Sequence, residues 1–203
     1  MEESQRKHIV RSIMEKQSYI GKQISGYTII EEIASGGQAS VFKARHNRIK
    51  EWPLVAIKLL NKGSITQEEQ DTFLREANFL KLLDENPHIL HIQHAGVDEE
   101  SGLPFLITDY ANGGSLEARI KSQPPSISSA LDIFKQLADA LLHAHKLDII
   151  HRDIKPANIL FNSKGQALLA DFGIADRLDA IAHDMRNERR LLQKQAAGFS
   201  EGG

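Results

Sequence analysis

The chain has 203 residues, of which 41% are hydrophobic and 26% are charged, and its formal net charge is -2. This composition is that of an ordinary globular protein, and the charge balance gives no electrostatic reason to expect binding to nucleic acid or an anionic membrane surface. The absence of cysteine excludes disulfides, thiolate catalysis and cysteine-bound zinc. No stretch approaches the roughly 20 apolar residues that cross a bilayer, so we expect a cytoplasmic chain without a membrane segment.

The first part of the chain divides into a polar leader and a strand-rich region. Residues 1–26 are charged throughout and lack the apolar core of a signal peptide. Three short runs rich in β-branched and aromatic residues then predict strands over 27–33, 40–46 and 53–60. Gly36 and Gly37 supply the turn between the first two runs.

A helix is predicted over residues 66–83, because its apolar side chains recur at helical spacing. Thr66 followed by Glu69 fits a capping box at its start. Two further strand-like runs follow at 88–97 and 103–110, and the sequence NGGS at 112–115 predicts a turn.

The second half is predicted to be mainly helical. Residues 128–146 form the strongest helical pattern, with an apolar stripe made of Leu131, Phe134, Leu137, Ala138, Leu141 and Leu142. Short strands are expected around 159–161 and 167–170, and a polar helix-like stretch begins at Ile174. Strands first, with one helix among them, followed by a helical half indicate an α+β chain of two lobes.

The sequence HRDIKPANIL at 151–160 carries side chains suited to phosphoryl transfer. That reaction needs an acceptor for a hydroxyl proton, a cation near the moving phosphate and oxygen ligands for Mg²⁺. Asp153, Lys155 and Asn158 supply these three in one loop after a long helix. Asp171 opens a DFG sequence directly after an apolar run, where its carboxylate could hold Mg²⁺ against phosphates.

Lys58 ends the sequence VAIK inside an apolar strand. A lysine in such a place is costly unless it is paired. Glu76, on the predicted helix of the first lobe, is the expected partner.

In order and spacing these residues resemble the signature set of protein kinases, over about 27–175, and among bacterial enzymes they look like the eukaryotic-type (Hanks-type) serine/threonine class. The resemblance implies a two-lobed fold. Residues 27–111 would form a β-rich N-lobe with one helix, and 112–203 an incomplete helical C-lobe.

The resemblance also implies roles for individual residues with MgATP as the cofactor. Lys58, held by Glu76, would grip the α- and β-phosphates, and Asp153 would orient or deprotonate the substrate hydroxyl. Lys155 would neutralise the γ-phosphate, while Asn158 and Asp171 would bind Mg²⁺. The adenine site would be formed by Thr108, Asp109, Ala111, Val41, Ala56 and Leu160. An internal spine of stacked side chains would be formed by Leu80, His151 and Phe172.

The glycine-rich loop departs from the family pattern. The G-x-G-x-x-G-x-V positions fall here on Ala34, Gly36, Ala39 and Val41, with Gly37 beside the one matching glycine. The loop needs a backbone that can lie close over phosphates, and alanine meets the size requirement while stiffening the chain. We therefore expect the loop to serve, with a cost to ATP affinity.

Each motif alone has an ordinary structural explanation. The loop could be a simple hairpin turn, Lys58 a lysine that reaches the surface, and HRD a charged turn. The conjunction of all of them in the family's order favours the kinase reading. His88, His91 and His94 do not have the spacing to share one strand face as metal ligands, and no P-loop sequence is present.

The family continues after DFG through a phosphorylatable loop to an A-P-E sequence and further helices. This sequence contains no A-P-E, and Ser200 carries the only hydroxyl side chain after Asp171. We expect a gene fragment, a truncated reading frame or a degenerate kinase, with a second lobe of marginal stability. The function expected is a protein serine/threonine kinase with an unknown protein substrate. A nucleotide-binding or scaffolding pseudokinase is the main alternative, and a small-molecule phosphotransferase is a more distant one.

Overall fold

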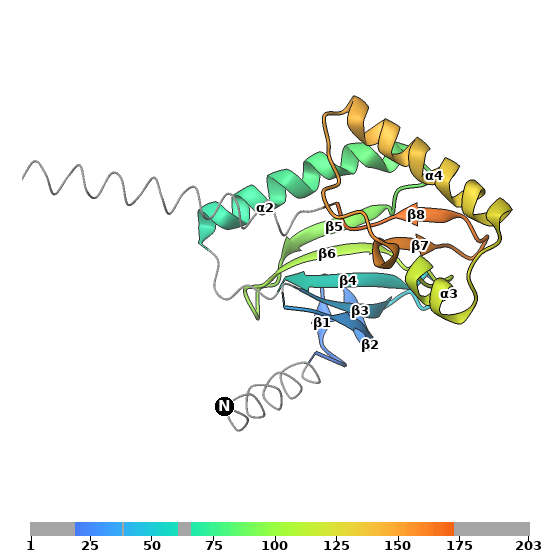
Figure 1. Cartoon of the computed structure of the whole chain (residues 1–203). Coiled ribbons are helices and arrows are strands. Elements are labelled where there is room, and N and C mark those ends of the chain that lie inside the picture. Colours follow the sequence, from blue (N-terminus) through green and yellow to red (C-terminus); the bar gives the residue numbers. More distant parts are fainter. Residues whose placement is uncertain (1–18, 38, 61–65, 173–203) are drawn as a thin grey trace, which may run out of the picture.

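A computed structural model describes residues 19–37, 39–60 and 66–172. Its largest element is an antiparallel sheet of six strands in the order β1-β2-β3-β4-β6-β5 (Figure 1). The strands are β1 (Gln23–Ile24), β2 (Tyr27–Ser35), β3 (Ala39–His46), β4 (Val55–Leu60), β5 (Ile92–Val97) and β6 (Pro104–Asp109). The predicted strands are confirmed, although β5 begins four residues later than the apolar run at 88.

Helix α2 (Gln67–Leu80) lies along β5 and continues into a 3-10 turn over Lys81–Glu85 (Figure 1). It begins where the sequence predicts. The Thr66 amide donates to the Glu69 carboxylate at 2.8 Å, and the Glu69 amide donates to the Thr66 hydroxyl at 3.3 Å. This reciprocal pair is the predicted capping box, which satisfies donors that have no partner within the helix.

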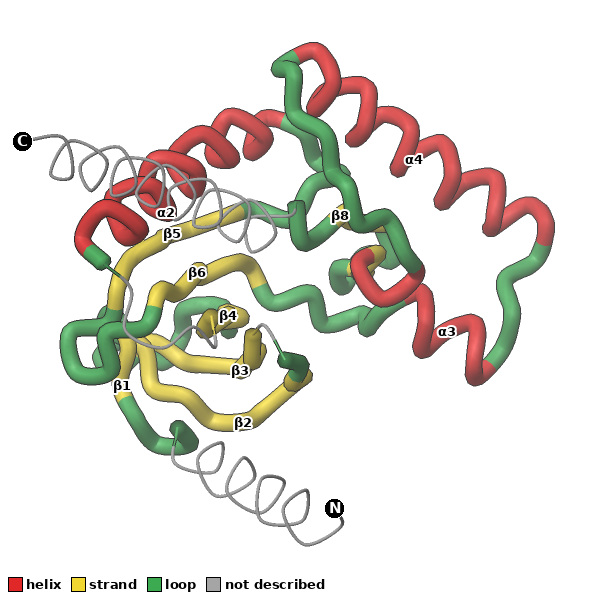
Figure 2. Tube along the Cα trace, turned by 60° about the vertical axis from the view of Figure 1, so that its left-hand side comes forward, coloured by secondary structure: helices red, strands yellow, loops and turns green. Residues whose placement is uncertain are grey.

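The second half contains α3 (Leu116–Ser122), α4 (Ile127–Lys146), a 3-10 turn (Pro156–Asn158) and a two-stranded sheet of β7 (Ile159–Phe161) and β8 (Ala167–Leu169). Figure 2 shows these elements grouped at the opposite end of the molecule from β1 and β2. The NGGS turn is confirmed, but α3 directly after it is not predicted by the sequence. Ser115 caps α3 by accepting from the Ala118 amide at 3.2 Å. Among the described helices, none is long and apolar enough to span a membrane.

Two apolar cores organise the fold. One covers a face of the large sheet and includes Phe42, Ile57 and Ile107. The other joins both halves, since it contains residues of α2, β6, α4, β7 and β8. The segment between the 3-10 turn and β5 reinforces this junction, because the Leu90 amide donates to the Leu169 carbonyl at 3.0 Å and the buried Asn86 amide donates to Asp139 at 2.9 Å.

The apolar stripe predicted for α4 is only partly buried, with Leu137 and Leu141 packed against the core that joins both halves. Phe134 is 68% exposed, and Leu131 and Leu142 are also more than half exposed, whereas Ala140 and Ala144 are fully buried. The helix is apolar on more than one side, and its fully buried members, Ala140 and Ala144, are small. Periodicity finds an apolar face, but it does not identify which of two such faces meets the neighbouring sheet.

Candidate active site

One face of the large sheet brings together most of the side chains predicted to bind a nucleotide. Cross-strand pairing aligns Ala34, Val41, Lys58 and Leu106 in one row, and Glu31, Lys43, Ala56 and Thr108 in the next. Directly opposed residues present their side chains on the same side of a sheet. We call this side the Lys58 face; the opposite side carries Phe42, Ile57 and Ile107 of the apolar core.

The turn between β2 and β3 closes the first row. The Gly36 amide donates to the Ala39 carbonyl at 2.9 Å, and the hydroxyls of Ser35 and Ser40 lie 3.3 Å apart. Ala34, Gly36 and Gly37 are exposed, and a Cβ added to Gly37 would meet no atom within 4 Å. The described part of the turn therefore leaves open space beside its backbone, as a phosphate-binding loop requires.

The segment after β6 offers backbone groups at the edge of the Lys58 face. The Asp109 amide is already used, since it donates to the His91 carbonyl at 3.2 Å, and the Thr108 hydroxyl donates to the Asp109 carbonyl at 3.3 Å. Of the predicted adenine-reading groups, the carbonyl of Asp109 and the backbone of Ala111 are thus the ones suited to a ligand.

His151 organises the loop that carries the predicted catalytic residues. Its ring is only 1% exposed, its Nδ1 accepts from the Asp153 amide at 3.2 Å, and its Nε2 lies 2.8 Å from the Ala170 carbonyl. Because Nδ1 accepts, Nε2 must carry the proton and donate to Ala170. Burial lowers the pKa of His151 below its ordinary value, which keeps the ring neutral and in this tautomer.

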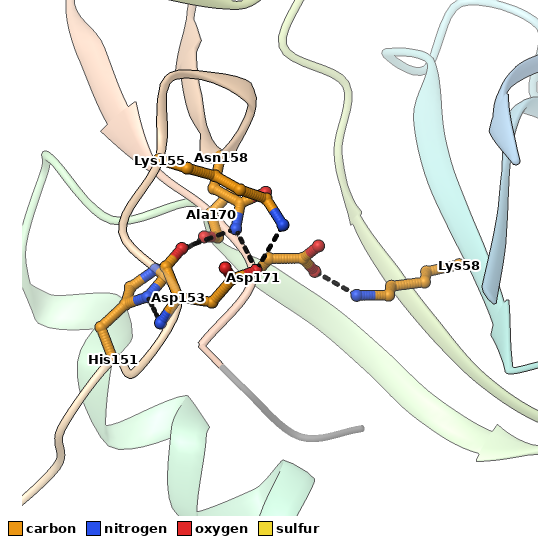
Figure 3. Close-up of polar contacts among 7 residues, drawn as sticks. All are labelled: Lys58, His151, Asp153, Lys155, Asn158, Ala170 and Asp171. Carbon is orange, nitrogen blue, oxygen red and sulfur yellow. Dashed lines mark hydrogen bonds and ion pairs between the residues drawn. The ribbon is translucent and has the colours of Figure 1, made fainter. Parts of the chain in front are cut away.

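Asp153 is held by two neighbours in the same loop (Figure 3). Its carboxylate accepts from the Lys155 ammonium at 2.7 Å and from the Asn158 amide at 2.9 Å. The Asn158 amide also donates to the Asp153 carbonyl at 2.8 Å. The hydrogen bond from Lys155, supported by the one from Asn158, lowers the pKa of Asp153, so the carboxylate is charged and oriented at neutral pH.

Asp171 connects this loop to the Lys58 face. Its φ of 65° lies in the left-handed region, which non-glycine residues rarely adopt. The chain turns there as it leaves β8, and the Asp171 carboxylate forms an ion pair with the Lys58 ammonium (Figure 3). The next residue, Phe172, packs its ring 4.5 Å from that of His151. Residues 113 positions apart in the sequence, Lys58 and Asp171, therefore meet.

The polar groups fit a Mg²⁺ ion that is shared with phosphates. Mg²⁺ takes one or two protein oxygens and completes its shell with water and phosphate oxygens. Asp171 offers a carboxylate, and Asn158 offers its amide oxygen, since its amide nitrogen faces Asp153. Within the described residues, no group of three or more acidic or histidine side chains is arranged to hold a metal ion.

The structure thus brings together Lys58, Asp153, Lys155, Asn158 and Asp171, all predicted from motifs. Leu160 lies in β7, opposite Leu168, and of the predicted spine Leu80 and Phe172 share the core that joins the two halves. Glu76 lies in α2, but its side chain is outside the described part, so its pairing with Lys58 stays a prediction. Sequence reasoning missed Glu31 and Lys43. Lys43 lies two residues after Val41 on the same strand, so alternation could have placed it on the same face, whereas Glu31 is separated from Ala34 by a register shift that alternation does not give.

Comparison with known proteins agrees with this geometry. The protein kinase domain family matches residues 27–190. The chain is 38% identical over 164 residues to the serine/threonine-protein kinase PrkC of Bacillus subtilis, covering 79% of this chain and 24% of PrkC. It is 36% identical over 154 residues to the probable serine/threonine-protein kinase pknA2 of Bifidobacterium longum, covering 73% of this chain and 20% of that protein.

A solved structure supports the same fold. The kinase domain of PknI from Mycobacterium tuberculosis superposes with a TM-score of 0.63 at 28% identity, covering 76% of this chain and 61% of the PknI chain. The chain therefore spans only part of the relatives that it matches. The matched family, the bacterial serine/threonine kinase relatives and the shared fold show that the chain belongs to the protein kinase domain family.

Proposed function

We propose that this chain binds MgATP and belongs to an enzyme that transfers the γ-phosphoryl group to a serine or threonine hydroxyl of a protein. The observation that supports this most strongly is the convergence of Asp153, Lys155 and Asn158 with the Lys58–Asp171 ion pair. The named relatives are serine/threonine kinases.

Each polar residue has a task that its surroundings support. Asp153, whose pKa is lowered, would accept a hydrogen bond from the substrate hydroxyl and orient it, or accept its proton as the phosphorus–oxygen bond forms. Lys155 would turn from Asp153 toward the transferring phosphate, which would then supply a second anionic partner. Asn158 and Asp171 would hold Mg²⁺, which when bound neutralises charge on the phosphate oxygens.

Nucleotide binding would change the surroundings of Lys58. In the structure its ammonium pairs with Asp171, so the α- and β-phosphates would have to replace this carboxylate or share the lysine with it. Glu76 would hold Lys58 in that arrangement. Val41, Ala56 and Leu160 would cover the two sides of adenine, and Ala34, Gly36 and Gly37 would border the phosphates.

The same ion pair favours a second candidate, a nucleotide-binding module without transfer. The Lys58 ammonium already pairs with Asp171, so it would compete with Mg²⁺ for the predicted metal ligand. In that case, nucleotide would bind without aligned transfer to a protein hydroxyl, as in the pseudokinase expected as an alternative.

Phosphate transfer separates the two candidates. The chain is incubated with γ-labelled ATP, Mg²⁺ and a generic protein substrate such as casein, and incorporated label is measured. Transfer by the unaltered chain that falls by about 100-fold or more in Asp153→Ala supports the enzyme. Asp132→Ala, at an exposed carboxylate on α4, is the matched control and should retain transfer. Nucleotide binding without any transfer would support the second candidate.

A further inference from the structure

Lys43 is a cation on the Lys58 face that the mechanism above does not use. It sits two residues after Val41 on β3 and is directly paired with Ala56 on β4, two positions proposed to cover adenine. Its side chain is only 22% exposed, which is low for a lysine. Such a placement needs partners, and the structure supplies two of them.

The first partner is Glu31 on the neighbouring strand β2. The Lys43 ammonium lies 3.2 Å from the Glu31 carboxylate, and the two residues are directly opposed in the sheet. This hydrogen bond is the main cause that raises the pKa of Lys43, so the ammonium stays charged. The pair joins β2 and β3 on the side of the hairpin that leads to the turn between them.

The second partner is Tyr110, which follows β6 outside the sheet. The Lys43 ammonium lies 4.9 Å from the centre of the Tyr110 ring, within the range of a cation–π contact. Tyr110 stands between Asp109 and Ala111, whose backbone groups are proposed to read adenine. The contact therefore ties the β2–β3 hairpin to the adenine-reading segment.

We propose that Glu31, Lys43 and Tyr110 form a clasp that sets the distance between the β2–β3 hairpin and the segment 109–111, and that Lys43 is thereby a positioning residue for the adenine base. The clasp rests on the proposed nucleotide binding. Lys43 acts through Val41 and Ala56 beside it. These two side chains would contact the base only when the clasp holds the β2–β3 hairpin at the right distance from the segment 109–111.

The test measures equilibrium affinity for ATP and AMP by displacement of a fluorescent nucleotide, well below the unfolding temperature. Lys43→Met keeps the length of the side chain and removes the charge, so it should weaken both nucleotides by the same factor, about threefold to tenfold. Lys43→Arg retains both contacts and should restore the affinity. Tyr110→Leu should weaken binding similarly. The double variant of Lys43→Met and Tyr110→Leu should bind nucleotide no less tightly than the single variant with the lower affinity.

A matched control exists on the other side of the sheet. Lys22 lies 5.0 Å from the ring of Tyr19, and Tyr19 packs against the core that lies away from the Lys58 face. Lys22→Met should leave the affinity for both nucleotides unchanged. If Lys43→Met affects neither nucleotide, the clasp is overturned.

Two further outcomes also count against the clasp. A loss for ATP without a loss for AMP would mean that Lys43 attracts the distal phosphates and does not position the base. If the unaltered chain binds neither nucleotide, the proposed function itself fails and the clasp fails with it. That pattern differs from the case in which the unaltered chain binds and the Lys43 variants bind equally well.

Discussion

The loop at 151–158 and the turn at 34–39 both belong to the candidate active site, but they are built in opposite ways. In the loop, His151 and Asn158 are buried and each makes hydrogen bonds that fix Asp153. In the turn, Ala34, Gly36 and Gly37 are exposed. In the described part of the turn, the Gly36 amide donates to the Ala39 carbonyl and the Ser35 and Ser40 hydroxyls lie 3.3 Å apart.

This difference separates the parts of the site that are built in advance from those that a ligand must complete. A largely buried hydrogen-bonded network holds its geometry without ligand, because the loss of one member leaves a polar group without a partner. An exposed turn can move locally at a small cost in free energy. We therefore expect changes in the loop to alter folding stability, and changes in the turn to alter nucleotide affinity alone.

Replacing His151 should have the largest effect. His151→Ala removes a buried ring that contacts Phe172 and leaves the Ala170 carbonyl and the Asp153 amide without their partner. The expected loss in the free energy of unfolding is about 3 kcal/mol, measured by urea denaturation. His145→Ala, at an exposed position on α4, should change it by less than about 0.5 kcal/mol. Equal effects of the two substitutions would remove the contrast between loop and surface.

Asn158→Ala should have the next largest effect. Its amide bridges the carbonyl and the carboxylate of Asp153, and the side chain is buried. Loss of this bridge should lower the free energy of unfolding by about 1–3 kcal/mol in the same assay. A stability equal to that of the unaltered chain would show that Asp153 is not held by this network.

Acid should weaken the loop through His151. Its pKa is lowered in the folded state, so the unfolded chain binds a proton first as pH falls below the ordinary value of 6.5. The stability that the neutral ring contributes is complete above that pH and is lost below it. Between pH 7.5 and 5.5 we expect about 1 kcal/mol of loss that disappears in His151→Gln. An unchanged pH dependence in that variant would contradict the buried neutral tautomer.

Gly37→Ala should have the smallest effect on folding. The added Cβ meets no atom within 4 Å, so the free energy of unfolding should change by less than about 0.5 kcal/mol. Affinity for MgATP should nevertheless fall, because the methyl group would occupy space proposed for phosphate. A loss of stability without a change in affinity would reverse the comparison and assign the turn a structural role.

Local chemistry explains which features could be predicted from the sequence. The Thr66–Glu69 capping box and the strand at 159–161 depend on neighbours in the chain, and the structure confirms both. The outward stripe of α4 and the ion pair between Lys58 and Asp171 depend on how distant elements pack. Motif order predicts that Lys58 and Asp171 meet in one site, but motifs and periodicity do not give the direct ion pair between them or the side of α4 that faces the neighbouring sheet.

The central claim is that Asn158 and Asp171 complete a site for a metal-bound nucleotide facing Lys58. Isothermal titration with ATP, with and without Mg²⁺, tests it directly in the unaltered chain and in Asp171→Asn. The account predicts tighter binding with Mg²⁺ in the unaltered chain, and loss of this Mg²⁺-dependent gain in the variant. Equal Mg²⁺ dependence in both proteins, or no binding of ATP by either, would contradict it.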